Sequence, residues 1–333
     1  MTPIYSLSAG TETDISQYPY STGGRWDSCV LGGVAILNNG LNNPQYWGGA
    51  GDAVDLPYDA TDAANVCTWD DQGLKAKIIR PFKYHLFAFD IDDCSGRNRR
   101  RLMWSHPAEP GSLPITWDFT KADYDAGDTE LSDTNGYILD ALQLRDTMQI
   151  YMDGAIYAAT YTGRQDRNIF TFRPVTLSKG IYARNSVADI GGRHFLVSDG
   201  DIYLYDGTNF QSIADERVKQ LFFDGGVSRS HYENAFCHYY HRTGEVWLCY
   251  PVPGDRYCTK ALVWDSNQNV WSQRDIPECT AATFAVVDRV STYTWATLPY
   301  ATWADWGITP ASPLWTSWIL PIDNAPIYDS LLL

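Results

Sequence analysis

The sequence predicts an all-β protein, and more narrowly a β-propeller of about six blades whose ring is complete or incomplete. Two observations predict this fold: a strand, turn and strand signal that recurs along the chain, and a composition rich in turn-forming and aromatic residues. The clearest copy of the signal is LVSDGDIYLYDGTNF at residues 196–210, where Asp199-Gly200 separates two short apolar runs. Glycine has no Cβ, so it accepts the positive φ angles that two-residue hairpin turns require.

The hairpin signal recurs with a nearly constant spacing. Six turns are centred near Gly40, Asp93, Gly154, Gly200, Gly244 and Asp288. The last four lie 44 to 46 residues apart, and the earlier ones are more widely spaced. A repeat of about 40–50 residues that contains short strands is typical of propeller blades.

The composition supports many short strands and turns and excludes some functions. The chain has 33 Asp but only 7 Glu, and it has 22 Tyr and 13 Trp. Asp favours turns and helix caps, whereas Glu favours helix interiors. The net charge of −15 excludes wholesale wrapping of nucleic acid, which needs Lys and Arg. An acidic wall along which double-stranded DNA slides without sticking stays open.

Cysteine use and the chain start bear on the compartment. The seven Cys are scattered and odd in number, and the opening Met-Thr-Pro-Ile-Tyr has no basic region followed by an apolar core. We expect free thiols in a protein made in a reducing cytoplasm. No run of 18 apolar residues predicts a membrane span.

Three segments follow from the pattern along the chain. Residues 1–30 are predicted to form an extended arm that lies on the surface or docks on another subunit. Residues 31–300 form the propeller, and residues 301–333 form a Trp-rich closing or docking segment. Within the propeller, residues 215–222 predict a short helix with Asp215 as its N-cap.

Three clusters are candidates for contacts with other molecules. The basic cluster near residue 99 is predicted to be an exposed turn that pairs with Asp of an adjacent subunit or blade, or that contacts phosphate. The Asp-rich insertion at residues 119–144 is predicted to be a rim loop. The Trp cluster is typical of a subunit contact or a closing seam, with carbohydrate stacking as the alternative. The candidate residues are Arg97, Arg99, Arg100, Arg101, Asp123, Asp125, Asp128, Trp303, Trp306, Trp315 and Trp318.

The sequence predicts no catalytic residues, no cofactor and no metal site. His238 and His241 with Cys237 suggest zinc, but residues three apart on a strand face opposite sides, and no Cys-x-x-Cys accompanies them. Calcium bound by Asp90, Asp92 and Asp93 or by the acidic loop at residues 123–133 stays open, although solvated turn carboxylates explain these residues better. No phosphate loop, His-Glu-x-x-His or Gly-x-Ser-x-Gly motif is present.

Two stretches carry a resemblance to a known family. LMWSHPAEPGSLPITWDFTKADYDAGDTELSDTNGYILDALQLRDTMQIYMDGAIY (residues 102–157) and GGVAILNNGLNNPQYW (residues 32–47) resemble the tail tubular or nozzle proteins of short-tailed bacteriophages. The resemblance implies a virion tail protein that forms a ring, with six copies, below the portal and adaptor proteins. It further implies contacts with tail fibres or a plug protein and transient contact with DNA during genome ejection, and no catalytic residues. Many nozzle proteins are longer than this chain, so a shorter hub or tube component is also open.

Two other functions remain open from the sequence. Propellers also serve as carbohydrate-binding or glycan-cleaving proteins, such as receptor-binding tailspike-like proteins, and the Glu residues are candidates for paired carboxylates. The third possibility is an intracellular interaction propeller, which predicts a single soluble subunit.

Overall fold

The computed structural model of the chain describes residues 4–8, 11–18, 20, 25–163, 169–287 and 328–332. The chain divides into two compact units, Met1–Thr280 and Ala281–Leu333.

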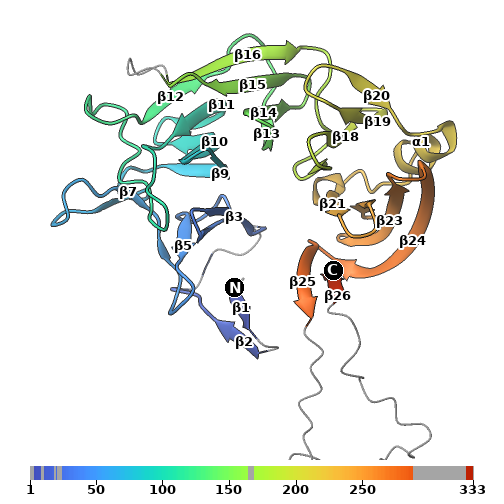
Figure 1. Cartoon of the computed structure of the whole chain (residues 1–333), viewed down its shortest axis with the longest axis horizontal. Coiled ribbons are helices and arrows are strands. Elements are labelled where there is room, and N and C mark those ends of the chain that lie inside the picture. The colour runs from blue at the N-terminus through green and yellow to red at the C-terminus, as the bar shows by residue number, and fades with distance from the viewer. Residues whose placement is uncertain are drawn as a thin grey trace, which may run out of the picture. The chain divides into compact units, whose positions relative to one another are not determined.

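The described residues of the first unit form a β-propeller, so the predicted fold class is confirmed (Figure 1). They make five four-stranded blades, where the sequence predicts about six. Blade 1 consists of β3 (Asp27–Leu31), β4 (Val34–Asn38), β5 (Gln45–Trp47) and β6 (Val54–Asp55). Blade 2 consists of β9 (Lys75–Phe82), β10 (His85–Asp93), β11 (Gly96–Trp104) and β12 (Gly127–Glu130). Blade 3 consists of β13 (Ile138–Leu144), β14 (Thr147–Met152), β15 (Ile156–Tyr161) and β16 (Phe170–Thr176). Blade 4 consists of β17 (Val187–Asp189), β18 (His194–Ser198), β19 (Asp201–Tyr205) and β20 (Phe210–Ser212). Blade 5 consists of β21 (Phe236–Tyr240), β22 (Glu245–Tyr250), β23 (Cys258–Asp265) and β24 (Val270–Cys279).

Each blade is an antiparallel meander in which the strands follow one another in chain order. The first strand of each blade is the innermost, and the last is the outermost (Figure 1). The inner strands are neighbours in sequence order, from β3 to β9, β13, β17 and β21. Side chains on the inner strands therefore meet at the centre of the propeller.

The recurrent turns of the sequence mark the blades one by one. The turns at Gly40, Cys94, Gly154 and Gly200 join the second and third strands of blades 1 to 4, whereas Gly244 joins the first two strands of blade 5. Gly200 has φ +77°, which a side chain would strain, and it separates β18 from β19 as predicted. The sixth turn, at Asp288, lies outside the described residues.

The core lies between adjacent blades. Blades 2 and 3 share a cluster of large apolar side chains that includes Phe87, Trp104 and Phe170, with the last ring 4.7 Å from that of Phe87. Between blades 1 and 2, Trp69 and Trp117 are fully buried with ring centroids 4.9 Å apart. The abundant aromatic residues therefore fill the wedges that open between flat sheets placed around a ring.

Two short elements lie outside the blades. The predicted helix is confirmed as α1 (Glu216–Phe223), because the side chain of Asp215 accepts a hydrogen bond from the backbone amide of Val218 at 2.8 Å. A short hairpin, β7 (Pro57–Asp59) and β8 (Cys67–Thr68), follows blade 1, and the 3-10 helix η1 (Tyr232–Asn234) precedes blade 5. No helix in the described part of the chain is long and apolar enough to cross a membrane.

The Asp-rich insertion differs from the predicted rim loop. It supplies β12, the outermost strand of blade 2, and then enters β13 of blade 3. The reason is that the backbone of Gly127–Glu130 pairs with β11, from Trp104 opposite Gly127 to Arg101 opposite Glu130. The side chain of Asp128 projects from this strand without disturbing its hydrogen bonds.

The N-terminal segment contains a hairpin, β1 (Tyr5–Ser8) and β2 (Thr11–Asp14). Two tyrosines that follow this hairpin form hydrogen bonds with blade 1 of the same chain. The Tyr18 hydroxyl donates to Asp55 at 2.9 Å, and the buried Tyr20 donates to the Gln45 side chain at 2.5 Å. In the second unit, β25 (Thr283–Val287) pairs antiparallel with β26 (Tyr328–Leu332).

Candidate functional site: the axial hub and its mouth

An arginine from blade 2 joins three blades at the centre of the propeller. Arg80, on β9, places one guanidinium nitrogen 2.5 Å from Asp27 Oδ2 of blade 1. A second nitrogen lies 2.8 Å from Asp140 Oδ1 of blade 3 and 3.4 Å from Asn185 Oδ1, which precedes blade 4. The side chains of Arg80 and Asp140 are only 13% and 7% exposed.

Asn185 extends this network to the remaining blades. Its backbone amide donates to Asp140 Oδ2 at 3.1 Å, and its carbonyl accepts from the Cys237 amide of blade 5 at 2.7 Å. The neighbouring Arg184 donates to Asp27 Oδ2 at 2.8 Å, which links blade 4 back to blade 1. We call Asp27, Arg80, Asp140, Arg184 and Asn185 the axial hub. A continuous set of hydrogen bonds therefore passes through all five blades.

Two local features of the backbone aim these groups inward. Asn185 adopts φ +61°, a left-handed conformation that Asn tolerates better than most residues. In β13 the register shifts between Ile138 and Asp140, so one extra residue bends the strand just before the carboxylate. Such bulges re-aim a side chain, and here Asp140 turns toward Arg80.

The hub charges stabilise one another against the cost of burial. Burial alone would raise the pKa of Asp27, but the guanidinium groups of Arg80 and Arg184 outweigh it and hold that pKa at about 2. Burial likewise disfavours the charge on Arg80, but Asp140 and Asp27 raise its pKa above the ordinary value. The charged forms of Asp27 and Arg80 therefore stabilise each other in the hub.

A cavity of about 330 Å³ opens beside the hub, and we call it the axial mouth. Most of the residues that line it lie on the inner strands, in the segments just before them, and on strands β10 and β11. Its charged and polar walls are formed by Arg25, Lys77, Asp90, Arg97, Arg99, Asp153, Arg184, Asn185, Glu233 and Asn234. Its apolar and aromatic walls are formed by Ile78, Tyr137, Ile138, Leu139, Tyr182, Ala183 and Tyr232. Arg25 packs over the Phe236 ring of blade 5 at 5.4 Å, so blade 5 meets the segment that leads into blade 1.

The basic cluster at Arg97, Arg99, Arg100 and Arg101 lies on strand β11, so the predicted exposed turn is wrong. Three of these arginines form ion pairs with carboxylates of their own blade: Arg97 with Asp90, Arg100 with Glu130 at 2.8 Å, and Arg101 with Asp93 at 2.8 Å and Asp128 at 3.1 Å. We call these four pairs the arginine ladder. The turn of this hairpin is at Cys94-Ser95, directly before strand β11 begins.

A bulge explains how neighbouring arginines face different ways. Phe89 pairs with Leu102 and Ile91 with Asn98, so three residues of β11 lie opposite Asp90 alone. Asp90 adopts φ +57° at this point and is only 2% exposed. Arg99 turns to the other side and lies 3.6 Å over the Tyr137 ring. Thus Arg97 and Arg99 line the axial mouth, whereas Arg100 and Arg101 reach the outer strand.

The other candidate residues are separated from the hub. Asp123 is exposed in the loop before β12. The Asp125 amide donates to His106 Nδ1 at 3.1 Å, and its carbonyl accepts from Trp104 Nε1 at 3.0 Å. Asp128 joins the arginine ladder. The four tryptophans Trp303, Trp306, Trp315 and Trp318 lie outside the described residues.

The metal candidates have other partners. Asp90 and Asp93 pair with Arg97 and Arg101, and His238 has interaction partners of its own. Across the residues that the structure describes, no group of three or more His, Cys, Asp or Glu side chains could hold a metal ion. All seven cysteines are free thiols.

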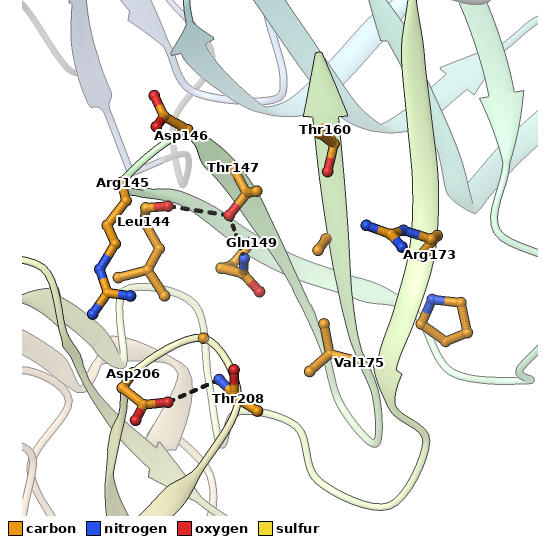
Figure 2. A pocket seen from close by; sticks show the side chains of 13 residues that line it. Leu144, Arg145, Asp146, Thr147, Gln149, Thr160, Arg173, Val175, Asp206 and Thr208 are labelled. Atoms are coloured by element: carbon orange, nitrogen blue, oxygen red, sulfur yellow. Dashed lines mark hydrogen bonds between the residues drawn. The ribbon is translucent and has the colours of Figure 1, made fainter. Parts of the chain in front are cut away.

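A second cavity of about 490 Å³, which we call the interblade groove, lies between blade 3 and the turn that follows β19 (Figure 2). Hydroxyl and amide groups line one wall: Gln149 donates to Thr147 Oγ1 at 2.8 Å, and Thr147 donates to the Leu144 carbonyl at 3.1 Å. Arg145 and Arg173 stand on opposite sides of the groove (Figure 2). These groups can hydrogen-bond a polar ligand, although no aromatic face is among the lining residues.

The hub and both cavities were not identified from sequence. The hub partners lie 53 and 60 residues from Arg80. Asp27, Arg80 and Asp140 each lie on the first strand of a blade, and this shared position is the signal that could have pointed to the hub.

Comparison with known proteins gives little further information. No family model matches the chain, and no curated protein matches it. Among solved structures, the chain is similar to the extracellular domain of BT4673 from B. thetaiotaomicron, with 14% identity and a TM-score of 0.41. The alignment covers 74% of this chain and 29% of that one, so the chain spans less than a third of that structure's length. We draw no functional argument from a similarity at this level.

Proposed function

We propose that this protein is a structural component of the tail of a short-tailed bacteriophage. In this proposal several copies, six by family resemblance, form a ring below the portal and adaptor that belongs to the genome ejection conduit. The two stretches that carry the resemblance, residues 32–47 and 102–157, fall on blades 1, 2 and 3. They supply paired strands of those blades.

The observation that carries the proposal is the axial hub. Burying charges is costly, and such pairs are retained where they specify one arrangement rather than add stability. Here each pair forms only when neighbouring blades are in the correct position, because Asp27, Arg80 and Asp140 come from three blades. A propeller joined in this way is a stiff unit, and stiffness suits a subunit that must hold its shape in a ring.

The same hub constrains where DNA would pass. Hub side chains occupy the centre of the propeller, so a conduit would have to lie between subunits rather than through one of them. The net charge of −15 would then make the wall of that conduit repel phosphate and limit sticking.

The test is whether the protein belongs to virus particles. Mass spectrometry of purified particles from the source is expected to find this chain in a fixed ratio to the portal protein. Native mass spectrometry of the recombinant full chain, alone and mixed with the adaptor, is expected to find a ring at least in the mixture. The absence of this chain from purified virus particles would overturn the proposal.

The second candidate is a carbohydrate-binding or glycan-cleaving propeller, and the interblade groove favours it. Its threonine hydroxyls, the Gln149 amide and two guanidinium groups match the hydrogen-bonding needs of sugar hydroxyls. A glycan array and a hydrolysis screen test this candidate. Binding that is lost in Arg173→Ala and retained in Arg193→Ala would favour it, because both arginines are exposed but only Arg173 lines the groove.

A further inference from the structure

The axial mouth gathers more positive charges than its carboxylates neutralise. Its cations are Arg25, Lys77, Arg97, Arg99 and Arg184, and its carboxylates are Asp90, Asp153 and Glu233. Asp90 is already paired with Arg97, and Arg184 is paired with Asp27 of the hub. Neither Arg25 nor Lys77 forms an ion pair with a carboxylate in the described part of the chain.

The surroundings of Arg25 and Lys77 disfavour the charged forms of their side chains. Burial lowers the pKa of Lys77, and the charges of Arg184 and Arg97 lower it further. Burial also lowers the pKa of Arg25, with a smaller contribution from Arg184. In addition, the buried Nε of Arg184 has no hydrogen-bond partner among the described residues. An anion in the mouth would relieve all three conditions.

Guanidinium and ammonium groups together favour an oxyanion. Arginine presents planar, paired donors that match the two oxygens of a carboxylate or phosphate, and lysine adds a point charge. Charge-assisted hydrogen bonds in a partly buried cavity are among the strongest available to a protein. One anionic group could be held between blades 1, 2 and 4 by these side chains.

The other walls define what the anionic group is attached to. Tyr137 lies under Arg99, and Tyr182 packs edge-on against Tyr232 with ring centroids 5.3 Å apart, so aromatic surface borders the cations. Asp153 and Glu233 are exposed and can accept hydrogen bonds from hydroxyl groups. They would also repel a second negative charge. These walls favour a small ligand with one negative charge, an apolar ring face and several hydroxyls.

We propose that the axial mouth binds an acidic sugar, with its carboxylate between Arg25 and Lys77 and its ring against the tyrosines. The volume of about 330 Å³ is at the lower end of ligand pockets, which suits one sugar unit. This binding goes beyond the structural role proposed above and does not depend on it. Strands of nucleic acid fit less well, because their repeated phosphates would meet Glu233 and Asp153.

The test uses the full chain and three probes: glucuronate, glucose and inorganic phosphate, each followed by isothermal titration calorimetry. We expect glucuronate to bind, with an affinity that falls as the NaCl concentration rises, because salt screens charge pairs. Glucose and phosphate are expected to bind at least about ten-fold more weakly, since each lacks either the charge or the ring. Phosphate binding as tight as glucuronate binding would overturn the acidic-sugar assignment.

Two matched variants locate the site. Lys77→Met removes a mouth cation and is expected to weaken glucuronate binding about ten-fold or more, as losing a charged hydrogen bond does. Lys75→Met, two residues away on the same strand, changes the net charge equally but lies outside the mouth. It is expected to leave the affinity unchanged.

A stability measurement separates binding from folding. Because Lys77 is half-buried beside two arginines, its replacement by Met is expected to maintain or raise the Tm while the affinity falls. No glucuronate binding at millimolar concentration, or full binding by Lys77→Met, would overturn the proposal. Both results are independent of whether the chain is present in virus particles.

Discussion

The axial hub and the arginine ladder are built from the same chemical pairs but hold different parts of the molecule together. Arg80 of the hub is 13% exposed and reaches carboxylates of two other blades. Arg100 and Arg101 of the ladder are 34% and 20% exposed, and the carboxylates that they pair with all belong to blade 2. The hub therefore fixes how blades are placed, whereas the ladder reinforces strand pairing that the backbone already provides.

The difference lies in what replaces each pair when it is broken. Around the Arg100 and Arg101 pairs of the ladder, water can solvate a carboxylate that loses its arginine, because Glu130, Asp93 and Asp128 are 38%, 26% and 29% exposed. The ladder pair of Arg97 differs, since its partner Asp90 is only 2% exposed. In the hub, Asp140 is 7% exposed, so an unpaired charge would remain away from water. Exposed pairs usually contribute little to stability, whereas breaking a buried pair is strongly destabilising.

The largest expected effect comes from removing the central hub cation. Arg80→Met leaves Asp27 and Asp140 without their main partner and is expected to lower the free energy of unfolding by about 3–5 kcal/mol. Urea unfolding followed by tryptophan fluorescence measures this change. Arg100→Met in the ladder is the matched control. Equal losses in the two variants would contradict the distinction between hub and ladder.

Lowering the pH is expected to destabilise the hub by an amount between those of the other two predictions. Because the folded pKa of Asp27 is about 2, below the ordinary value of 3.8, its ionised form stabilises the fold above pH 4. This contribution, about 2 kcal/mol, is lost as the pH falls from 4 toward 2. Urea unfolding at several pH values is expected to give a shallower acid slope for Asp27→Asn. The exposed Asp146→Asn is expected to leave the slope unchanged.

The smallest expected effect concerns the ladder. Arg101→Gln removes two pairs that are 2.8 and 3.1 Å long, and it is expected to cost about 0.5–1 kcal/mol because both partners stay accessible to water. Raising NaCl to about 1 M is expected to reduce that cost, since salt screens exposed pairs far more than buried ones. A cost above that of Arg80→Met would reverse the assignment of roles.

Most of the fold can be predicted from residues that are close together in the sequence. Turn residues such as Asp199-Gly200 and the capping residue Asp215 act on their immediate neighbours, so their positions can be predicted from short stretches. The rim loop predicted for the Asp-rich insertion is wrong because strand pairing with β11, rather than composition, decides the structure of this segment. The candidate site was harder still, since neither the hub nor the axial mouth is formed by residues adjacent in sequence.

The sequence by itself determined the all-β class, the recurrence of the hairpins and the free state of the thiols, because these follow from turn chemistry and composition. The tertiary structure alone decided that β9, β13 and the turn before β17 meet, and that Arg80 is placed between two carboxylates there. The bulges at Asp90 and Leu139 determine which arginines and aspartates face the axis. The physical reason is that the meaning of a charged side chain depends on which partners and how much water surround it, and both are set by blades that are distant in sequence.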